Sequence, residues 1–115
     1  MCSSDLNITG AVVGVNGAPP ADPGWWQTRS LGAAALDISL VAKGALDGYV
    51  DLHDHGVWDY LAAALICREA GCIIEDALGR DLLVPDAAER RSPVVANSRP
   101  LLDALLSARQ RASRD

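Results

Sequence analysis

The stretch WDYLAAALICREAG, residues 58–71, carries the strongest helix pattern in the chain. Its apolar residues recur at helical spacing and predict one continuous apolar stripe, formed by Trp58, Leu61, Ala62, Leu65, Ile66 and Ala70. Gly71 follows the last of them, and glycine is preferred where a helix ends in the left-handed conformation. Asp59 stands at the N-terminal end of this predicted helix, where a negative charge meets unpaired backbone N–H groups.

Shorter patterns on both sides of this helix predict alternating strands and helices. A second helix is expected over residues 30–43, with Ser30 as its N-cap and Gly44 as its end, and a third from Asn97 or Ser98 to about Gln110. Strands are expected at residues 7–15, 46–52, 72–75 and 93–96, with a further possible strand at 81–84 and a loop at 16–24. This order predicts an α/β fold, a layered αβα arrangement with a mixed β-sheet.

Composition limits the classes of protein to which the chain can belong. Its 115 residues allow one small domain or part of a larger one. A net charge of −5 argues against binding to a nucleic acid polymer, and no apolar run approaches the ~20 residues that span a membrane. The three cysteines are odd in number and form no CxxC pair, which argues against a disulfide framework and favours a cytoplasmic protein.

The first six residues, MCSSDL, read like a translated cloning adapter. We therefore expect residues 1–6 to be a non-native leader on a truncated chain. Residues 7–28 are expected to form a strand and a loop rich in proline and glycine, and residues 29–115 the main domain.

Two groups of acidic residues are candidates for chemistry. Asp59 is either a helix cap or a ligand for a hard cation such as Mg²⁺, and a single carboxylate cannot build such a site alone. Asp51 closes a predicted strand and could accept a hydrogen bond from a substrate hydroxyl, or be an ordinary strand end. The cluster Asp51, His53, Asp54 and His55 could hold zinc or iron, but the chain has no further histidine to complete such a site.

The segment TRSLGAA, residues 28–34, is a third candidate. Gly32 at the first turn of the predicted helix would let a ligand approach the backbone closely, although tight helix packing would explain the residue equally well. No nucleophile elbow, Walker A loop, dinucleotide fingerprint or HExxH motif is present in the sequence.

Together these stretches resemble the C-terminal half of the inositol monophosphatase family of Mg²⁺-dependent, lithium-sensitive phosphatases. Residues 29–47 look like the family's RSxGSAALD…VAxGxxD segment, and residues 58–71 like its WDxAAGxxLVxEAGG signature. Residues 73–80 and 94–97 resemble the strand, the DxxGR turn and the last strand that follow. The resemblance implies the C-terminal part of an αβαβα sandwich.

The resemblance also implies roles for particular residues. Asp59 would be a Mg²⁺ ligand, Asp51 would contact a substrate hydroxyl, and Gly32, Ala33 and Ala34 would line the substrate-binding turn. Ala33 replaces the family's usual serine or threonine, Leu61 and Ala63 replace smaller residues, and Cys72 replaces the second glycine of EAGG. The family's first-half glutamate and DPIDGT-like motif do not occur in the chain, so no catalytic set is complete within it.

The resemblance leads to two functional expectations. The first is a C-terminal fragment of a phosphatase for a small phosphate monoester, such as inositol monophosphate or a related sugar or alcohol phosphate. Such a fragment would be inactive alone, and its full-length form is expected to be a homo-oligomer. The alternative is a non-catalytic half-fold that binds a partner or supplies Asp59 in trans. In either case, apolar faces left without their partner would promote association.

Overall fold

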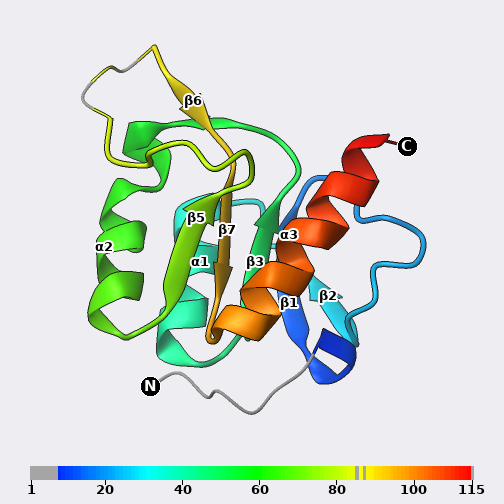
Figure 1. Ribbon diagram of the computed structural model, residues 1–115. Helices are drawn as coiled ribbons and strands as arrows, with labels where there is room; N and C mark the ends of the chain where they lie inside the picture. The colour runs from blue at the N-terminus through cyan, green and yellow to red at the C-terminus, as the bar shows by residue number, and fades with distance from the viewer. Residues whose placement is uncertain (1–7, 85, 87, 115) are drawn as a thin grey trace.

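The computed structural model of the chain describes residues 8–84, 86 and 88–114. The predicted leader at residues 1–6 therefore lies outside the described residues. Five strands form one mixed sheet in the order β2–β1–β3–β7–β5 (Figure 1). These strands are β1 (Val12–Asn16), β2 (Gln27–Arg29), β3 (Gly48–Asp51), β5 (Ile73–Asp76) and β7 (Pro93–Ala96). Strands β2, β1 and β3 are parallel, and β7 runs antiparallel to its neighbours β3 and β5.

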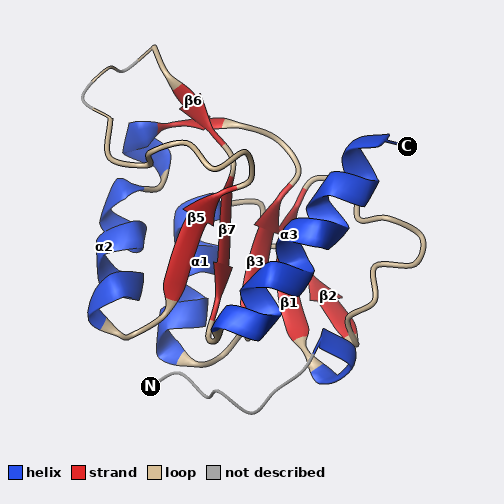
Figure 2. Cartoon of the chain, viewed as in Figure 1, coloured by secondary structure: helices blue, strands red, loops and turns tan. Residues whose placement is uncertain are grey.

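Helices cover both faces of this sheet and confirm the predicted αβα layers (Figure 2). Helices α1 (Ala34–Lys43) and α2 (Leu61–Glu69) pack together on one face, where Ile38, Val41, Tyr49 and Tyr60 are buried. Helix α3 (Arg99–Arg114) covers the other face over a second buried cluster, which includes Val13, Val50, Val94, Leu101 and Leu105. Alternate residues of the central strands thus face two separate cores.

Several boundaries differ from the sequence prediction. A 3-10 turn, η1 (Ile8–Gly10), replaces the start of the predicted first strand, and residues 81–84 form no strand. Strand β2 was not predicted. Nor was a second, two-stranded sheet, in which β4 (His55–Gly56) pairs with β6 (Arg90–Arg91). Strands of two or three residues are too short for an alternating pattern to appear in the sequence.

Helix α1 begins four residues after the predicted cap at Ser30. Gly32 adopts a left-handed φ of 78°, and Ala33 is extended, so the chain cannot be helical before Ala34. The end of α1 is as predicted, because Gly44 has a φ of 84° and donates its N–H to Leu40 and Val41. Ser98 caps α3 as expected, with its Oγ accepting the Leu101 N–H at 3.3 Å.

The predicted apolar stripe of α2 is wrong. The buried face of this region consists of Tyr60, Ala63, Ala64 and Cys67, whereas Trp58 is 74% exposed and Leu65 and Ile66 are about half exposed. Small side chains allow α2 to approach α1 so closely that the Cys67 thiol donates to the Ile38 carbonyl at 3.2 Å. Because α1 and α2 lie close together, small side chains fit between them, and the larger side chains of α2 remain exposed.

The cysteines lie in two different environments. Cys67 is a free thiol, and burial raises its pKa to about 11, so it is a structural residue rather than a nucleophile. Cys72 is disulfide-bonded, which the argument against a disulfide framework did not predict. Within the described ranges, no helix is both long and apolar enough to cross a membrane.

Candidate active site

A hollow of about 480 Å³ opens where the chain enters α1, beside the 3-10 turn η2 (Val57–Asp59) that leads into α2. Its lining contains Gly32, Ala33, Ala34, Ala35, His55, Trp58 and Asp59. The fold thus brings together four of the five residues predicted to form the site, from segments some 25 positions apart in sequence. Asp51, the fifth, is absent from the lining.

The Asp59 carboxylate lies at the mouth of this hollow. Its side chain is 59% exposed, and its one contact among the described residues is with Nδ1 of His55, 3.7 Å from its Oδ2. Tyr60, not Asp59, occupies the position before α2, and its side chain makes no cap hydrogen bond. The carboxylate is therefore open to a cation instead of being held by helix amides.

The opposite wall of the hollow is backbone. Gly32 has nothing within 4 Å of the place a Cβ would occupy, so this turn is open to a ligand. Ala33 precedes α1 and provides no side-chain cap. The first N–H groups of a helix have no partner within the helix, and here they can donate to an oxygen atom of a ligand.

Asp51 lies behind His55, at the end of β3, and has no exposed surface. Its carboxylate accepts hydrogen bonds from the Tyr49 hydroxyl at 2.8 Å and the His53 N–H at 2.9 Å, and Nε2 of His55 lies 2.6 Å away. Burial raises the pKa of Asp51, and these hydrogen bonds oppose the rise. The predicted contact of Asp51 with a substrate hydroxyl stays a prediction, because His55 stands between Asp51 and the hollow.

The alternative of a zinc or iron site is wrong. Asp54 pairs with Arg90 at 3.0 Å, and His53 lines a different hollow from the one that contains His55. Across residues 8–84, 86 and 88–114, no group of three or more histidine, cysteine or acidic side chains is arranged to hold a metal. Asp59 is the single carboxylate in the lining of its hollow, and its role as a magnesium ligand stays a prediction.

The sequence did not predict that His55 lies between Asp51 and Asp59, or that Asp37 is buried. The spacing of four residues on each side of His55 was visible, but it does not predict contact in a strand and loop. Asp37 in α1 is fully buried, and neither of its carboxylate oxygens has a hydrogen-bond partner in good geometry. Burial is the main cause that raises its pKa to about 6; the backbone N–H of Leu31 opposes the rise, and the charge of Asp51 adds to it.

Comparison with known proteins places this architecture in a family. The sequence profile described as the inositol monophosphatase family matches residues 5–114. The fructose-1,6-bisphosphatase of Pyrococcus furiosus is 40% identical over 83 residues, which are 70% of this chain and 33% of that protein. The inositol-1-monophosphatase of Mycobacterium tuberculosis is 42% identical over 85 residues, 72% of this chain and 26% of that enzyme.

Solved structures agree with this result. A Pyrococcus horikoshii protein described as similar to inositol-1 monophosphatase superposes with a TM-score of 0.75 at 31% identity, over 85% of this chain and 42% of that one. The layered fold agrees with the sequence match. The chain belongs to the inositol monophosphatase family and spans about a third or less of the length of these two curated relatives.

Proposed function

We propose that the chain supplies one wall of the active site of a Mg²⁺-dependent phosphatase acting on a small phosphate monoester, such as inositol monophosphate or a sugar phosphate. The observation that supports this proposal is the open Asp59 carboxylate facing the backbone turn at Gly32 across one hollow. The relatives similar in sequence are named fructose-1,6-bisphosphatase and inositol-1-monophosphatase, which supports the proposed substrate class.

Each group that lines the hollow would have its own role in the reaction. Asp59 would provide one oxygen ligand to Mg²⁺, which when bound activates water and stabilises the leaving oxygen in phosphate ester hydrolysis. The N–H groups at the start of α1 would orient an oxygen of the substrate, and Trp58 would limit the access of bulk water. His55 would hold Asp59 from behind through its contact at 3.7 Å.

A single carboxylate does not bind Mg²⁺ tightly, so the chain alone is expected to show negligible turnover of inositol phosphate. We therefore propose a test in a complete enzyme. Residues 29–106 of this chain would replace the matching segment of the Pyrococcus furiosus fructose-1,6-bisphosphatase, and Mg²⁺-dependent phosphate release would be measured.

The chimera should hydrolyse its substrate, and Asp59→Asn in the chimera should reduce kcat/KM at least about 100-fold, as loss of a catalytic metal ligand does. Asp54→Asn is the matched control, because Asp54 is an exposed carboxylate paired with Arg90, and it should change the rate less than about twofold. A folded chimera in which Asp59→Asn is fully active would disprove the proposal.

The exposed apolar side chains favour the alternative of a half-fold that works with a separate partner. Leu36, Leu65 and Ile66, on the two neighbouring helices, are each about half exposed. For this alternative, the chain would be mixed with a separately produced first half of a relative. Phosphatase activity that appears only in the mixture and is lost with Asp59→Asn would demonstrate function in trans.

A further inference from the structure

Asp37 is a buried carboxylate that the proposed reaction does not use. It lies in the first turn of α1, and its backbone N–H donates to the Ala33 carbonyl at 3.1 Å. Its side chain points to the sheet, because a Cβ built at Gly14 of β1 would lie 3.4 Å from both its Cβ and its Cγ. The carboxylate therefore lies between β1 and the start of α1, the segment that lines the hollow beside Asp59.

This position is unfavourable for the stability of the fold. The Asp37 carboxylate has no exposed surface, and neither of its oxygens has a hydrogen-bond partner in good geometry. The negative charge of Asp51 acts against it as well, and the Tyr49 hydroxyl donates to Asp51. Buried groups that lower stability are found most often where function requires them, so Asp37 is a candidate for a role in the site.

The turn before α1 depends on backbone contacts to keep its shape. Residues 30–33 are all exposed, and nothing lies within 4 Å of the place a Cβ of Gly32 would occupy. Gly32 has a φ of 78°, so the chain turns sharply here. The backbone N–H of Leu31, the residue before this glycine, lowers the pKa of Asp37 in opposition to burial and is therefore a donor beside the carboxylate.

A carboxylate in this place can act in the way that a capping box does. In that motif, an acidic residue in the first turn of a helix accepts an N–H from the chain that leads into the helix, and so fixes the path of that chain. Ala33 provides no side-chain cap at the start of α1. Asp37 is the fourth residue of α1 and Leu31 lies two residues before Ala33, so the contact reaches slightly further along the chain than the usual motif.

We propose that Asp37 is a positioning residue of the candidate active site. Its buried carboxylate holds the N–H of Leu31, and this contact keeps the Gly32 turn in the shape that presents the first N–H groups of α1 to an oxygen of the substrate. The inference rests on the proposed function of the hollow beside Asp59. Asp37 itself touches neither the metal nor the substrate, and its effect reaches the site through the backbone of residues 31–33.

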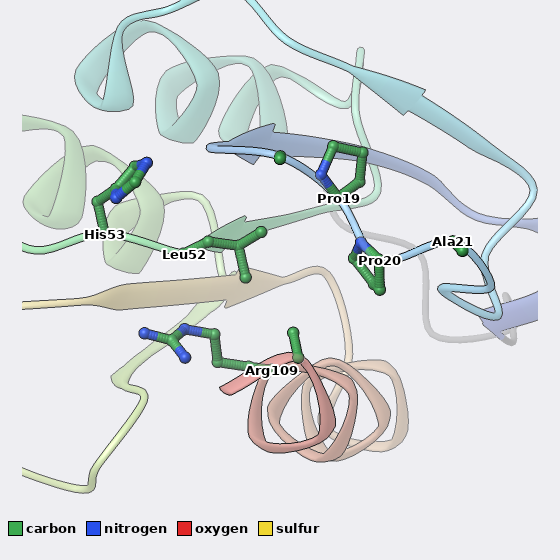
Figure 3. A pocket seen from close by; sticks show the side chains of 8 residues that line it. Pro19, Pro20, Ala21, Leu52, His53 and Arg109 are labelled. Atoms are coloured by element: carbon green, nitrogen blue, oxygen red, sulfur yellow. The ribbon is translucent and has the colours of Figure 1, made fainter. Parts of the chain in front are cut away.

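Amide hydrogen exchange in the full chain tests this contact without any assay of activity. Asp37→Asn loses the charge and keeps an oxygen acceptor, whereas Asp37→Leu loses both. The Leu31 amide should exchange at least about tenfold faster in Asp37→Leu, but within about threefold of its original rate in Asp37→Asn. The reference is the Leu52 amide, which donates to the Asn16 carbonyl at 2.9 Å. Leu52 lines a separate hollow of about 690 Å³ near the end of β3 (Figure 3), and its amide should exchange no faster in either variant.

The same variants in the chimera connect the contact to the site. Asp37→Leu should raise KM at least about fivefold and change kcat less than about twofold, because the turn contributes to substrate binding. Asp37→Asn should keep KM within about twofold of the original value. Asp103→Asn, at an exposed carboxylate on α3, is the control and should change neither constant. If Asp37→Leu does not fold, Asp37→Ala removes the acceptor without added volume and takes its place in both experiments.

Three results would overturn the inference. These are equal exchange of the Leu31 amide in the original chain and in Asp37→Leu, an unchanged KM in Asp37→Leu, or equal effects of Asp37→Leu and Asp37→Asn. The last result would mean that the charge or the packing of Asp37 matters and its hydrogen-bond acceptor does not. The proposed function fails on a different observation, full activity of the Asp59→Asn chimera, so the two failures are distinguishable.

Discussion

The Nε2 atom of His55 lies 2.6 Å from Oδ2 of Asp51, a carboxylate with no exposed surface. The other ring nitrogen faces Asp59 at 3.7 Å, so one imidazole joins the buried end of β3 to the open hollow. The Asn16 side-chain amide also lies next to this ring, 2.7 Å from the same Nε2. His55 thus belongs to the framework that supports Asp59.

Replacing His55 tests this framework. His55→Ala leaves the Asp51 carboxylate buried with one partner fewer, and we expect a loss of about 2 kcal/mol in the free energy of unfolding. The measurement is urea denaturation followed by tryptophan fluorescence. His53→Ala, in an exposed side chain, is the control and should cost less than about 0.5 kcal/mol. Equal losses in the two variants would contradict the assigned role of His55.

The buried Asp37 predicts a pH dependence of stability. Burial raises its pKa from 3.8 to about 6 on folding, so the folded state binds the proton more tightly than the unfolded state. The stabilisation from this proton is complete below pH 3.8 and is lost as the pH rises through about 6. At pH 7 the ionised carboxylate therefore costs on the order of 2–3 kcal/mol.

Asp37→Leu removes this titration with little change in side-chain length. The stability of the variant relative to the original chain should increase as the pH rises from 4 to 7, and urea midpoints measured across that range check this. Asp103→Leu, at an exposed carboxylate on α3, is the control and should show no comparable gain. A difference between Asp37→Leu and the original chain that does not vary with pH would show that Asp37 keeps its ordinary pKa.

The residue before α1 offers a stabilising substitution. Ala33 is extended, with φ −139° and ψ 113°, as an N-cap residue should be, but its side chain has no hydrogen-bonding atom. Ala33→Ser should stabilise the protein by about 1 kcal/mol through a bond to a free N–H of the first turn. Ala35→Ser, at the second residue of α1, should instead cost a few tenths of a kcal/mol, because serine is a poorer helix former than alanine. A thermal melt distinguishes the two outcomes.

Two glycines are required for different reasons. A Cβ at Gly48 would lie 2.5 Å from Cδ1 of Leu105 and 3.0 Å from the Val95 carbonyl oxygen, so Gly48→Ala should cost about 2–3 kcal/mol by forcing α3 from the sheet. Gly32→Ala meets open space but a φ of +78°, and should cost about 1 kcal/mol. Denaturation of both variants tests whether the Gly48→Ala loss is the larger.

The exposed apolar residues of α1 and α2 predict self-association of the chain. The double variant Leu65→Glu, Ile66→Lys keeps its net charge and should lower the apparent mass in light scattering at high concentration. Leu78→Lys, at a 75% exposed residue in a distant turn, is the control and should leave the mass unchanged. A monomeric original chain would refute the prediction.

Local sequence patterns were informative wherever a segment is long and its ends are marked by specific residues. Helix ends were predicted correctly at Gly44, Gly71 and Ser98. Every helix has backbone N–H and C=O groups at its ends without partners in the helix, and residues of these types satisfy them or allow the chain to turn. The sheet strands β3, β5 and β7 followed from short apolar runs. The two-residue pairing of β4 with β6 did not, because each strand exists only through its contact with the other.

The sequence by itself determined the layered α/β class, the family and the candidate residues Asp59, Gly32, Ala33 and Ala34, since these depend on residue types at fixed spacing. Only the tertiary structure decided that these residues line one hollow, that Asp51 is buried behind His55 and that α2 buries its alanines instead of its leucines. Burial and side-chain contact are properties of packing between distant segments, and packing density selects small residues at a close helix contact regardless of their hydrophobicity.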